Sequence, residues 1–399
     1  MRRIFLQFIL LSIVFFSSSC KKDKPTSFKF EADPAGQWYK GDFHVHATGA
    51  SNDTGGDSWP EAIKAKAIER NLDFVVLTDH SNSTGSDAST RDEDPALFNK
   101  GSEFPYWEKA KTLSGPDKFL MICGNEISPI AEDGKNTATG HIGCIPKTLT
   151  NFDTITPFID RPKGSITGGA ALQQALNRGC FTIINHPYNL ATWIEYDWTN
   201  MNYDAIEIWN GTIGYDFKDQ IARRAWICDL LNGKNSTAIG GSDCHRVNTP
   251  APGEGLDAAL AYPATAVFAQ RLNWNDIMNS LQQGNTYIFE GNSQLLIDTY
   301  NKNSKRSKTN FDIIRLRGKA DENIENAVLK LIHTTACADA RPTTDAPQLT
   351  ETILFETQIA AGGSFDIRFD ITSISGVYTA TLLGDGLHYG ALSRALVIE

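Results

Sequence analysis

The chain has 399 residues, a net charge of −10 and an ordinary globular composition, with 41% hydrophobic and 21% charged residues. This length allows two domains, or one large domain with an appendage. The acidic balance argues against a nucleic-acid platform, but it does not exclude phosphate esters, because bound divalent metals reverse the local charge of a site.

The first twenty residues predict a targeting segment. Two arginines precede a short apolar run, residues 4–16, which is too short for a comfortable membrane span. Three serines and Cys20 follow, which resembles the signal of bacterial lipoproteins, where cleavage leaves a lipidated cysteine; the alternative is a plain secretory signal with a chance cysteine. With residues 21–37 as a polar tether, we expect a cell-envelope lipoprotein, on the periplasmic face or the outer surface, held to the membrane by its lipid.

Seven short apolar runs predict strands in the first part of the chain. They span residues 42–47, 73–79, 119–127, 140–145, 180–186, 203–210 and 236–244. Residues 74–77 are continuously apolar, as in strands buried on both faces. Residues 60–71 and 168–178 show helical spacing, and each precedes a strand. Repeated helix-strand units favour a closed parallel sheet, with the chemistry at the carboxyl ends of its strands.

A change of pattern near residue 293 predicts a second domain. Residues 274–284 predict a last helix, and residues 286–289 predict the strand that leaves the first domain. Five β-rich runs separated by turn residues follow, at residues 311–316, 327–332, 364–371, 376–383 and 395–398. We therefore expect an α/β domain over residues 38–292 and a small β-sandwich over residues 293–399.

Six of the eight histidines lie in short motifs at or near the ends of these apolar runs. The motifs are His44-x-His46, Asp79-His80, His141 after a glycine, Asn185-His186 and Asp243-x-His245, with Glu126 at the end of another run. Each alone has an ordinary explanation, such as a helix-capping aspartate, a buried salt bridge or a core histidine. Together, histidines and carboxylates at successive strand ends predict one polynuclear metal site.

The order of these motifs resembles the PHP (polymerase and histidinol phosphatase) superfamily. The resemblance covers about residues 38–290, and it implies a distorted seven-stranded (β/α) barrel that holds two or three divalent metal ions, whether zinc, manganese or iron. The Gly284-x-Thr286-Tyr287 segment and the trailing β-domain look like the branch typified by carbaryl hydrolase. That branch acts on ester and phosphoester substrates, so the resemblance leaves the substrate class open.

The resemblance also implies a role for each motif. Three metals would be held by His44, His46, Glu126 and Asp243; by His80 and His245 with an aspartate from the loop after His46; and by Glu126, His141 and His186. That loop is longer than is usual in the family, and both Asp53 and Asp57 qualify, with Asp53 slightly preferred. Asp79 would orient a histidine without binding metal itself.

Hydrolysis is the predicted chemistry. Neighbouring metals lower the pKa of a bound water to near neutrality, so no serine or cysteine nucleophile is required. Asp243, His245 and Arg246 are expected to act in catalysis, Arg246 as a clamp on a phosphate oxygen unless it is only a surface arginine. Tyr188 and Asn210 are candidates for substrate contacts.

Three functions remain open at this point. The first is a phosphomono- or phosphodiesterase that uses a metal-bound hydroxide on small-molecule or glycan-linked esters. The second is a metal-dependent carboxyl or carbamate ester hydrolase. The third is a lipid-anchored glycan-binding protein with an inactive barrel. The sequence has neither a Gly-x-Ser-x-Gly elbow nor a P-loop, which weakens serine-hydrolase and NTPase interpretations. It carries no signal for an oligomeric state.

Six cysteines remain besides Cys20, without the spacing of a zinc ribbon. Three lie in apolar strand-like runs, where a buried free thiol is expected. The compartment would permit disulfides, but the sequence favours no particular pair. Cys244 should point away from the ligands on either side of it, because alternate residues of a strand face opposite sides.

Overall fold

The computed structural model describes most of the chain after residue 29. The described residues are 30–51, 53–80, 102–127, 140–158, 168–189, 201–211, 213–254, 257–307, 311–338, 347–371 and 374–398. The predicted signal segment with Cys20, and the first part of the predicted tether, lie outside them. Among the helices of the described residues, none combines the length and the apolar character needed to span a membrane.

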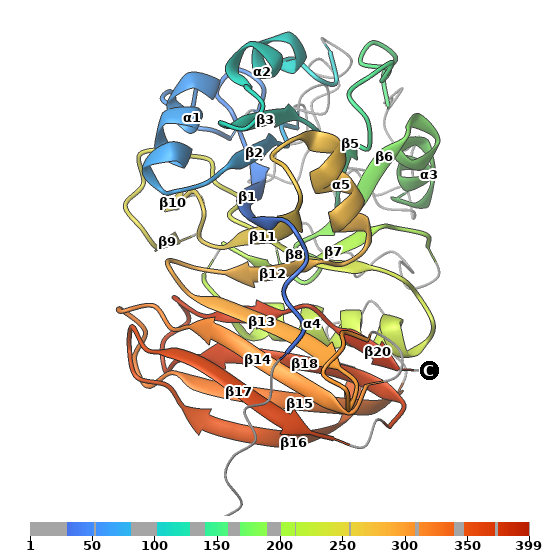
Figure 1. Cartoon of the computed structure of the whole chain (residues 1–399). Helices are drawn as coiled ribbons and strands as arrows, with labels where there is room; N and C mark the ends of the chain where they lie inside the picture. The colour runs from blue at the N-terminus through green and yellow to red at the C-terminus, as the bar shows by residue number, and fades with distance from the viewer. Residues whose placement is uncertain are drawn as a thin grey trace, which may run out of the picture.

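The first part of the chain is a mixed α/β structure (Figure 1). Its strands are β1 (Gln37–Val45), β2 (Phe74–Leu77), β3 (Leu120–Cys123), β4 (Asn125–Ile127), β5 (His141–Pro146), β6 (Cys180–Asn185), β7 (Ala205–Asn210) and β8 (Thr237–Gly241). Its helices are α1 (Pro60–Glu69), α2 (Trp107–Leu113), α3 (Gly168–Arg178) and α4 (Phe217–Leu231). All seven predicted strands occur near their expected positions, and the third is divided at Gly124 into β3 and β4.

Local sequence signals explain where several helices begin. α1 has a proline in its first turn, where the missing N–H costs nothing. The Asp216 side chain accepts hydrogen bonds from the backbone N–H groups of Lys218 and Asp219, and this capping box starts α4. The Asn273 side chain caps α5 (Trp274–Gln282) in the same way. The predicted helices at residues 60–71, 168–178 and 274–284 are confirmed as α1, α3 and α5.

The strand directions differ in one place from a wholly parallel sheet. β1, β2 and β3 are parallel, as are β6, β7 and β8, but β5 runs antiparallel to both β4 and β6. The parallel expectation is therefore wrong at β5, because an apolar run predicts a strand but does not reveal its direction. The register pairs His141 with Asn185, so the start of β5 lies at the same edge as the carboxyl end of β6.

Two sheets share the strands of this part. β1, β2 and β3 belong to a ten-stranded sheet, and β4 to β8 form a five-stranded sheet. The two sheets adjoin at Gly124, between β3 and β4, and at a parallel bridge between Val45 and Cys244. From β1 to β8 the neighbouring strands therefore follow chain order, first across one sheet and then across the other. A single closed seven-stranded barrel stays a prediction, because the pairing is divided between two sheets.

Apart from one separate pair of two-residue strands, the remaining strands extend the ten-stranded sheet or add a layer to it (Figure 1). They are β9 (Gly253–Glu254), β10 (Asp257–Ala258), β11 (Ala264–Ala269), β12 (Thr286–Phe289), β13 (Gln294–Tyr300), β14 (Ile313–Lys319), β15 (Val328–Ala338), β16 (Gln348–Gln358), β17 (Ser364–Asp370), β18 (Gly376–Leu383), β19 (Ala391–Ser393) and β20 (Leu396–Ile398). β13, β14 and β17 form a three-stranded sheet, and an aromatic contact of 4.6 Å between the Phe355 and Phe369 rings joins it to the larger one.

The predicted boundary at residue 293 falls within a shared sheet. β12 pairs antiparallel with β19, so the ten-stranded sheet runs from β1 to β3 through to β15 and β16. The end of the predicted tether also contacts the second part of the chain. The Phe30 ring lies 4.5 Å from the Tyr300 ring, and Arg317 forms an ion pair of 2.8 Å with Asp33. The division into two domains stays a prediction of the sequence.

Two disulfides link elements of the fold. Cys144 bonds Cys180 between β5 and β6, and Cys228 in α4 bonds Cys337 in β15. The expectation of a free thiol in an apolar run is therefore wrong for Cys144 and Cys180, and the sequence identified neither pair. Pairing depends on which strands become neighbours, and spacing along the chain does not reveal that. Cys123 and Cys244 are buried free thiols.

Candidate metal centre

Nine polar side chains meet at the common edge of the two sheets. They are His44, His46, Asp53, His80, Glu126, His141, His186, Asp243 and His245. Their ligand atoms form four overlapping groups, and within each group all the atoms lie within 4.8 Å of one another. Seven of these residues are buried, and the two aspartates are partly exposed. Every residue that the sequence suggested as a metal ligand, with Asp53 as the preferred loop residue, lies in this cluster.

Glu126 lies at the centre of the cluster. Its Oε1 atom is 3.0 Å from His44 Nε2 and 3.2 Å from both His141 Nδ1 and His186 Nε2. Its Oε2 atom is 3.5 Å from His46 Nε2 and 3.4 Å from His80 Nδ1. One carboxylate thus faces five imidazole rings, so it can bridge neighbouring cations.

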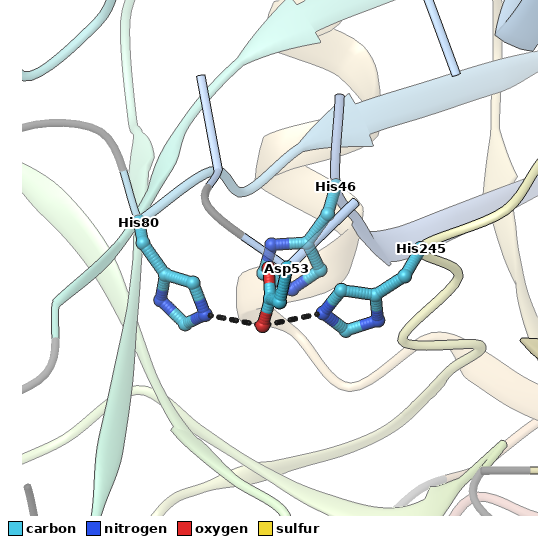
Figure 2. Close-up of side chains that lie close together, drawn as sticks. All are labelled: His46, Asp53, His80 and His245. Atoms are coloured by element: carbon cyan, nitrogen blue, oxygen red, sulfur yellow. Dashed lines mark ion pairs between the residues drawn. The ribbon is translucent and has the colours of Figure 1, made fainter. Parts of the chain in front are cut away.

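Asp243 and Asp53 complete the cluster on either side of His46. Asp243 Oδ1 is 3.2 Å from both His44 Nε2 and His46 Nε2. Asp53 Oδ2 lies between His80 Nε2, at 3.5 Å, and His245 Nε2, at 3.1 Å (Figure 2). The other loop candidate, Asp57, instead accepts a hydrogen bond from Asn248.

The backbone at two of these residues adopts an uncommon conformation. Asp243 has φ of 55° and His186 has φ of 27°, in the left-handed region that residues with a side chain rarely occupy. Such strain concentrates at functional sites, where the surrounding structure holds it.

A second set of contacts fixes how the rings face the cluster. His44 Nδ1 lies 3.1 Å from Glu207 Oε1, and His46 Nδ1 lies 3.0 Å from Ser51 Oγ. His245 Nδ1 lies 2.7 Å from the backbone oxygen of Asp243. In each ring the other nitrogen, Nε2, then faces the carboxylates. Such partners hold metal-binding histidines in one tautomer and orientation.

The sequence interpretation missed Glu207 and Ser51. Glu207 is buried in β7 between two isoleucines, and it also accepts hydrogen bonds from His186 N and the Asn210 side chain. A lone carboxylate inside an apolar strand is costly unless it is partnered. The same signal singled out Glu126, so it could have identified Glu207. Ser51 has no comparable signal.

Charge defines what the cluster can hold. Burial raises the pKa of the Glu126 and Asp243 carboxyls. The neighbouring histidines together have the larger effect, and they hold both pKa values well below the usual range. Burial holds the pKa of His46 at about 3 and that of His141 at about 4, so these rings are neutral at neutral pH. Burial also opposes protonation of His80, but Asp53 and Glu126 raise its pKa to about 9.

The other predicted site residues differ in their placement. Asp79 accepts hydrogen bonds from Ala47 N and the Ser51 hydroxyl, and Ser51 in turn contacts His46. Asn210 donates to Glu207 and, at 3.4 Å, to Asp243.

Tyr188 packs against the hydrophobic core. The Arg246 side chain is 48% exposed and forms an ion pair with Asp257, so its contacts do not place it in the cluster.

Comparisons with known proteins give distant likenesses in structure. A two-domain protein from Bacteroides vulgatus containing a predicted PHP-like metal-dependent phosphoesterase is 18% identical, with a TM-score of 0.45, over 92% of this chain and 98% of that one. The lesion-specific endonuclease Q of Pyrococcus furiosus is 16% identical, with a TM-score of 0.40, over 66% and 62% of the two chains. PsfC of Pseudomonas syringae is 17% identical, with a TM-score of 0.37, over 64% and 92%. No protein-family model and no curated protein matches the chain. The interpretation of the site rests on its own geometry.

Proposed function

We propose that the chain is a metal-dependent phosphoesterase of the PHP type that holds two or three divalent ions. The observation that carries the proposal is the convergence of six histidines and three carboxylates on one buried edge. In this proposal His44, His46, Glu126 and Asp243 would hold one ion, His80, His245 and Asp53 a second, and Glu126, His141 and His186 a third. Glu126 belongs to two of these sets, as a bridging carboxylate would.

The residues fit such ions on two independent grounds. All the ion pairs of Glu126, Asp243 and Asp53 among the described residues are with histidines, so no lysine or arginine balances their charge. Ionised carboxylates in a buried site need cations. The Nε2 atoms of His44 and His46 are buried and make no hydrogen bond within the described chain. Mixed imidazole and carboxylate ligands suit zinc, manganese or iron.

The chemistry follows from this donor set. Bound divalent ions supply a Lewis acid for the phosphoryl oxygens and a water acidic enough to act as hydroxide near neutral pH. In hydrolysis the water oxygen bonds to phosphorus, the ester P–O bond breaks, and the alcohol leaves with a proton. Asp243 is partly exposed, as is Asp53, so these two carboxylates are the members of the cluster that solvent and a substrate could reach. Asp243 also receives a hydrogen bond from Asn210.

The experiment that tests this proposal combines metal analysis with three substrates. The chain beginning after Cys20 is loaded with Zn²⁺ or Mn²⁺ and assayed with p-nitrophenyl phosphate, bis-p-nitrophenyl phosphate and p-nitrophenyl acetate. We expect two or three ions per chain and phosphoester turnover that is lost in His44→Ala. His333→Ala is the matched control, because His333 lies in β15 and stacks on Tyr378. Turnover of the acetate alone would move the assignment to carboxyl esters. If the chain bound no metal and hydrolysed none of the three substrates, the enzyme proposal would be overturned.

Glu207 provides a prediction about ring orientation. We expect Glu207→Gln to weaken metal binding about tenfold, because its carboxylate holds His44 Nδ1 and the His186 backbone N–H at once. Competition with a chelating indicator measures the affinity for Zn²⁺ directly. Asp257→Asn, which removes the exposed partner of Arg246, serves as a control with unchanged affinity. Equal affinity in Glu207→Gln and the wild type would show that the carboxylate does not position His44.

We also propose that the chain is a lipoprotein of the cell envelope. The order of charged, apolar and small residues before Cys20 supports a lipidated N-terminus. The two disulfides support an oxidising compartment, because such bonds are rare in the cytosol. Mass spectrometry of the N-terminal peptide checks the proposal: a diacylated Cys20 is expected, and a free or unprocessed N-terminus would contradict it.

A further inference from the structure

A second cavity lies at the other end of β1 from the metal centre. It has a volume of about 580 Å³, and its walls come from α5, β11, β12, β13 and the segment before β1. Trp38, at the start of β1, lines it, whereas His44 lies near the end of that strand. Six residues of extended chain separate these positions by roughly 20 Å. The cavity is therefore distinct from the metal centre, and its size is that of a small-molecule site.

One cation in the wall forms no direct ion pair with the described residues. Arg394 donates hydrogen bonds to the Ile297 backbone oxygen and to Asn285 Oδ1. Burial lowers the pKa of its guanidinium, and the charge of nearby Asp298 offsets part of that effect. A guanidinium carries five N–H donors, and three hydrogen bonds leave two of them available. A partly buried cation with unused donors favours an anion beside it.

The other charges around the cavity are already balanced. Arg306 and Arg317 both form ion pairs with Asp33 and Asp298. Asp276 pairs with Arg271 outside the cavity. Arg394 is therefore the charge in the wall that a ligand could neutralise.

The remaining walls suit a sugar-sized ring. The Trp38 and Phe268 rings lie 5.4 Å apart and are both only partly buried, which leaves aromatic surface against the cavity. Exposed Asn279 and Gln283 of α5 bring amide groups to the rim. Aromatic faces pack against the C–H groups of a pyranose, and amides bond its hydroxyls. We propose that this cavity binds an acidic sugar, with its anionic group against Arg394 and its ring near Trp38 and Phe268.

Calorimetric titration of the chelator-treated chain tests the proposal, because removing metal silences the first site. The probes are glucuronate, glucose 6-phosphate and glucose. We expect at least one acidic sugar to bind about tenfold or more tightly than glucose, and the two acids distinguish a carboxylate from a phosphate ligand. Arg394→Gln should abolish the preference for the acid. Arg246→Gln, at an exposed arginine elsewhere, should retain it.

A second variant guards against misfolding of Arg394→Gln. Asn279→Trp places a bulky ring at the exposed rim without changing a buried contact, and it should weaken binding of the acidic sugar more than tenfold. Equal binding of glucose and both acids, absence of binding by all three probes, or unchanged binding in Asn279→Trp would overturn the proposal. None of these outcomes depends on the metal centre, so the phosphoesterase proposal stands or falls separately.

Discussion

Replacing Glu126 with glutamine is expected to remove most of the bound metal and to lower phosphoester turnover roughly 10³-fold, or ~4 kcal/mol of transition-state stabilisation. The cause is the position of the carboxylate, whose two oxygens lie within 3.5 Å of five imidazole rings. Glutamine keeps one oxygen, but its amide nitrogen carries two N–H donors and no charge. It can therefore neither bridge two ions nor balance them. Elemental analysis of the purified variant, with turnover in the same sample, measures both effects.

Glu290→Gln is the matched control for this change. Glu290 is also fully buried and also faces an imidazole, His388 Nδ1 at 3.1 Å, but it lies outside the cluster. It should retain the wild-type metal content, even if its stability falls. Metal content and turnover that survive in Glu126→Gln would remove Glu126 as the bridging ligand and with it the proposed arrangement of the ions.

The elements that sequence predicted best are those whose pattern is local. Residues 74–77 are buried throughout β2, as a continuously apolar run suggests, and α3 begins and ends where its helical spacing does. α4 was missed, because ten of its fifteen residues are buried and so little amphipathic contrast remains. The sequence also provided no prediction for helix α2 or for strands β11, β13, β16 and β19. The pairing of β12 with β19 could not be predicted, because neither segment carries a sequence signal that specifies the strand with which it pairs.

The metal centre was more predictable than the fold around it. Polar residues beside a buried run are costly unless they serve a site, and six motifs at or near the ends of such runs carried histidine or a carboxylate. The sequence pattern did not reveal the direction of each strand or the distances between side chains. It did not reveal that antiparallel β5 brings His141 to the common edge, nor that Arg246 pairs with Asp257. Partners that act through hydrogen bonds to a ligand, such as Ser51, leave no periodic trace.

Substitutions at two adjacent glycines, at the end of β8, can distinguish the effect of crowding at the metal centre from the effect of crowding in the core. A Cβ atom on Gly241 would lie 2.5 Å from His44 Cβ and 2.7 Å from Glu207 Oε1. Gly241→Ala must therefore push apart a ligand and the carboxylate that orients it. We expect a loss of about 100-fold in Zn²⁺ affinity, at the upper end of effects on ligand orientation. Overpacking should also lower the free energy of unfolding by about 1–3 kcal/mol.

Gly240→Ala makes the same chemical change one residue earlier, on the opposite side of the strand. Its Cβ atom would lie 2.4 Å from Ile288 Cγ2, in the core, and would approach no ligand. Both variants should therefore lose similar stability in denaturant titrations of the metal-free chain, while only Gly241→Ala loses affinity in the indicator assay. If the two affinities fell equally, the effect would come from general strain in β8. If neither fell, the contact of β8 with His44 and Glu207 would not set the geometry of the metal centre.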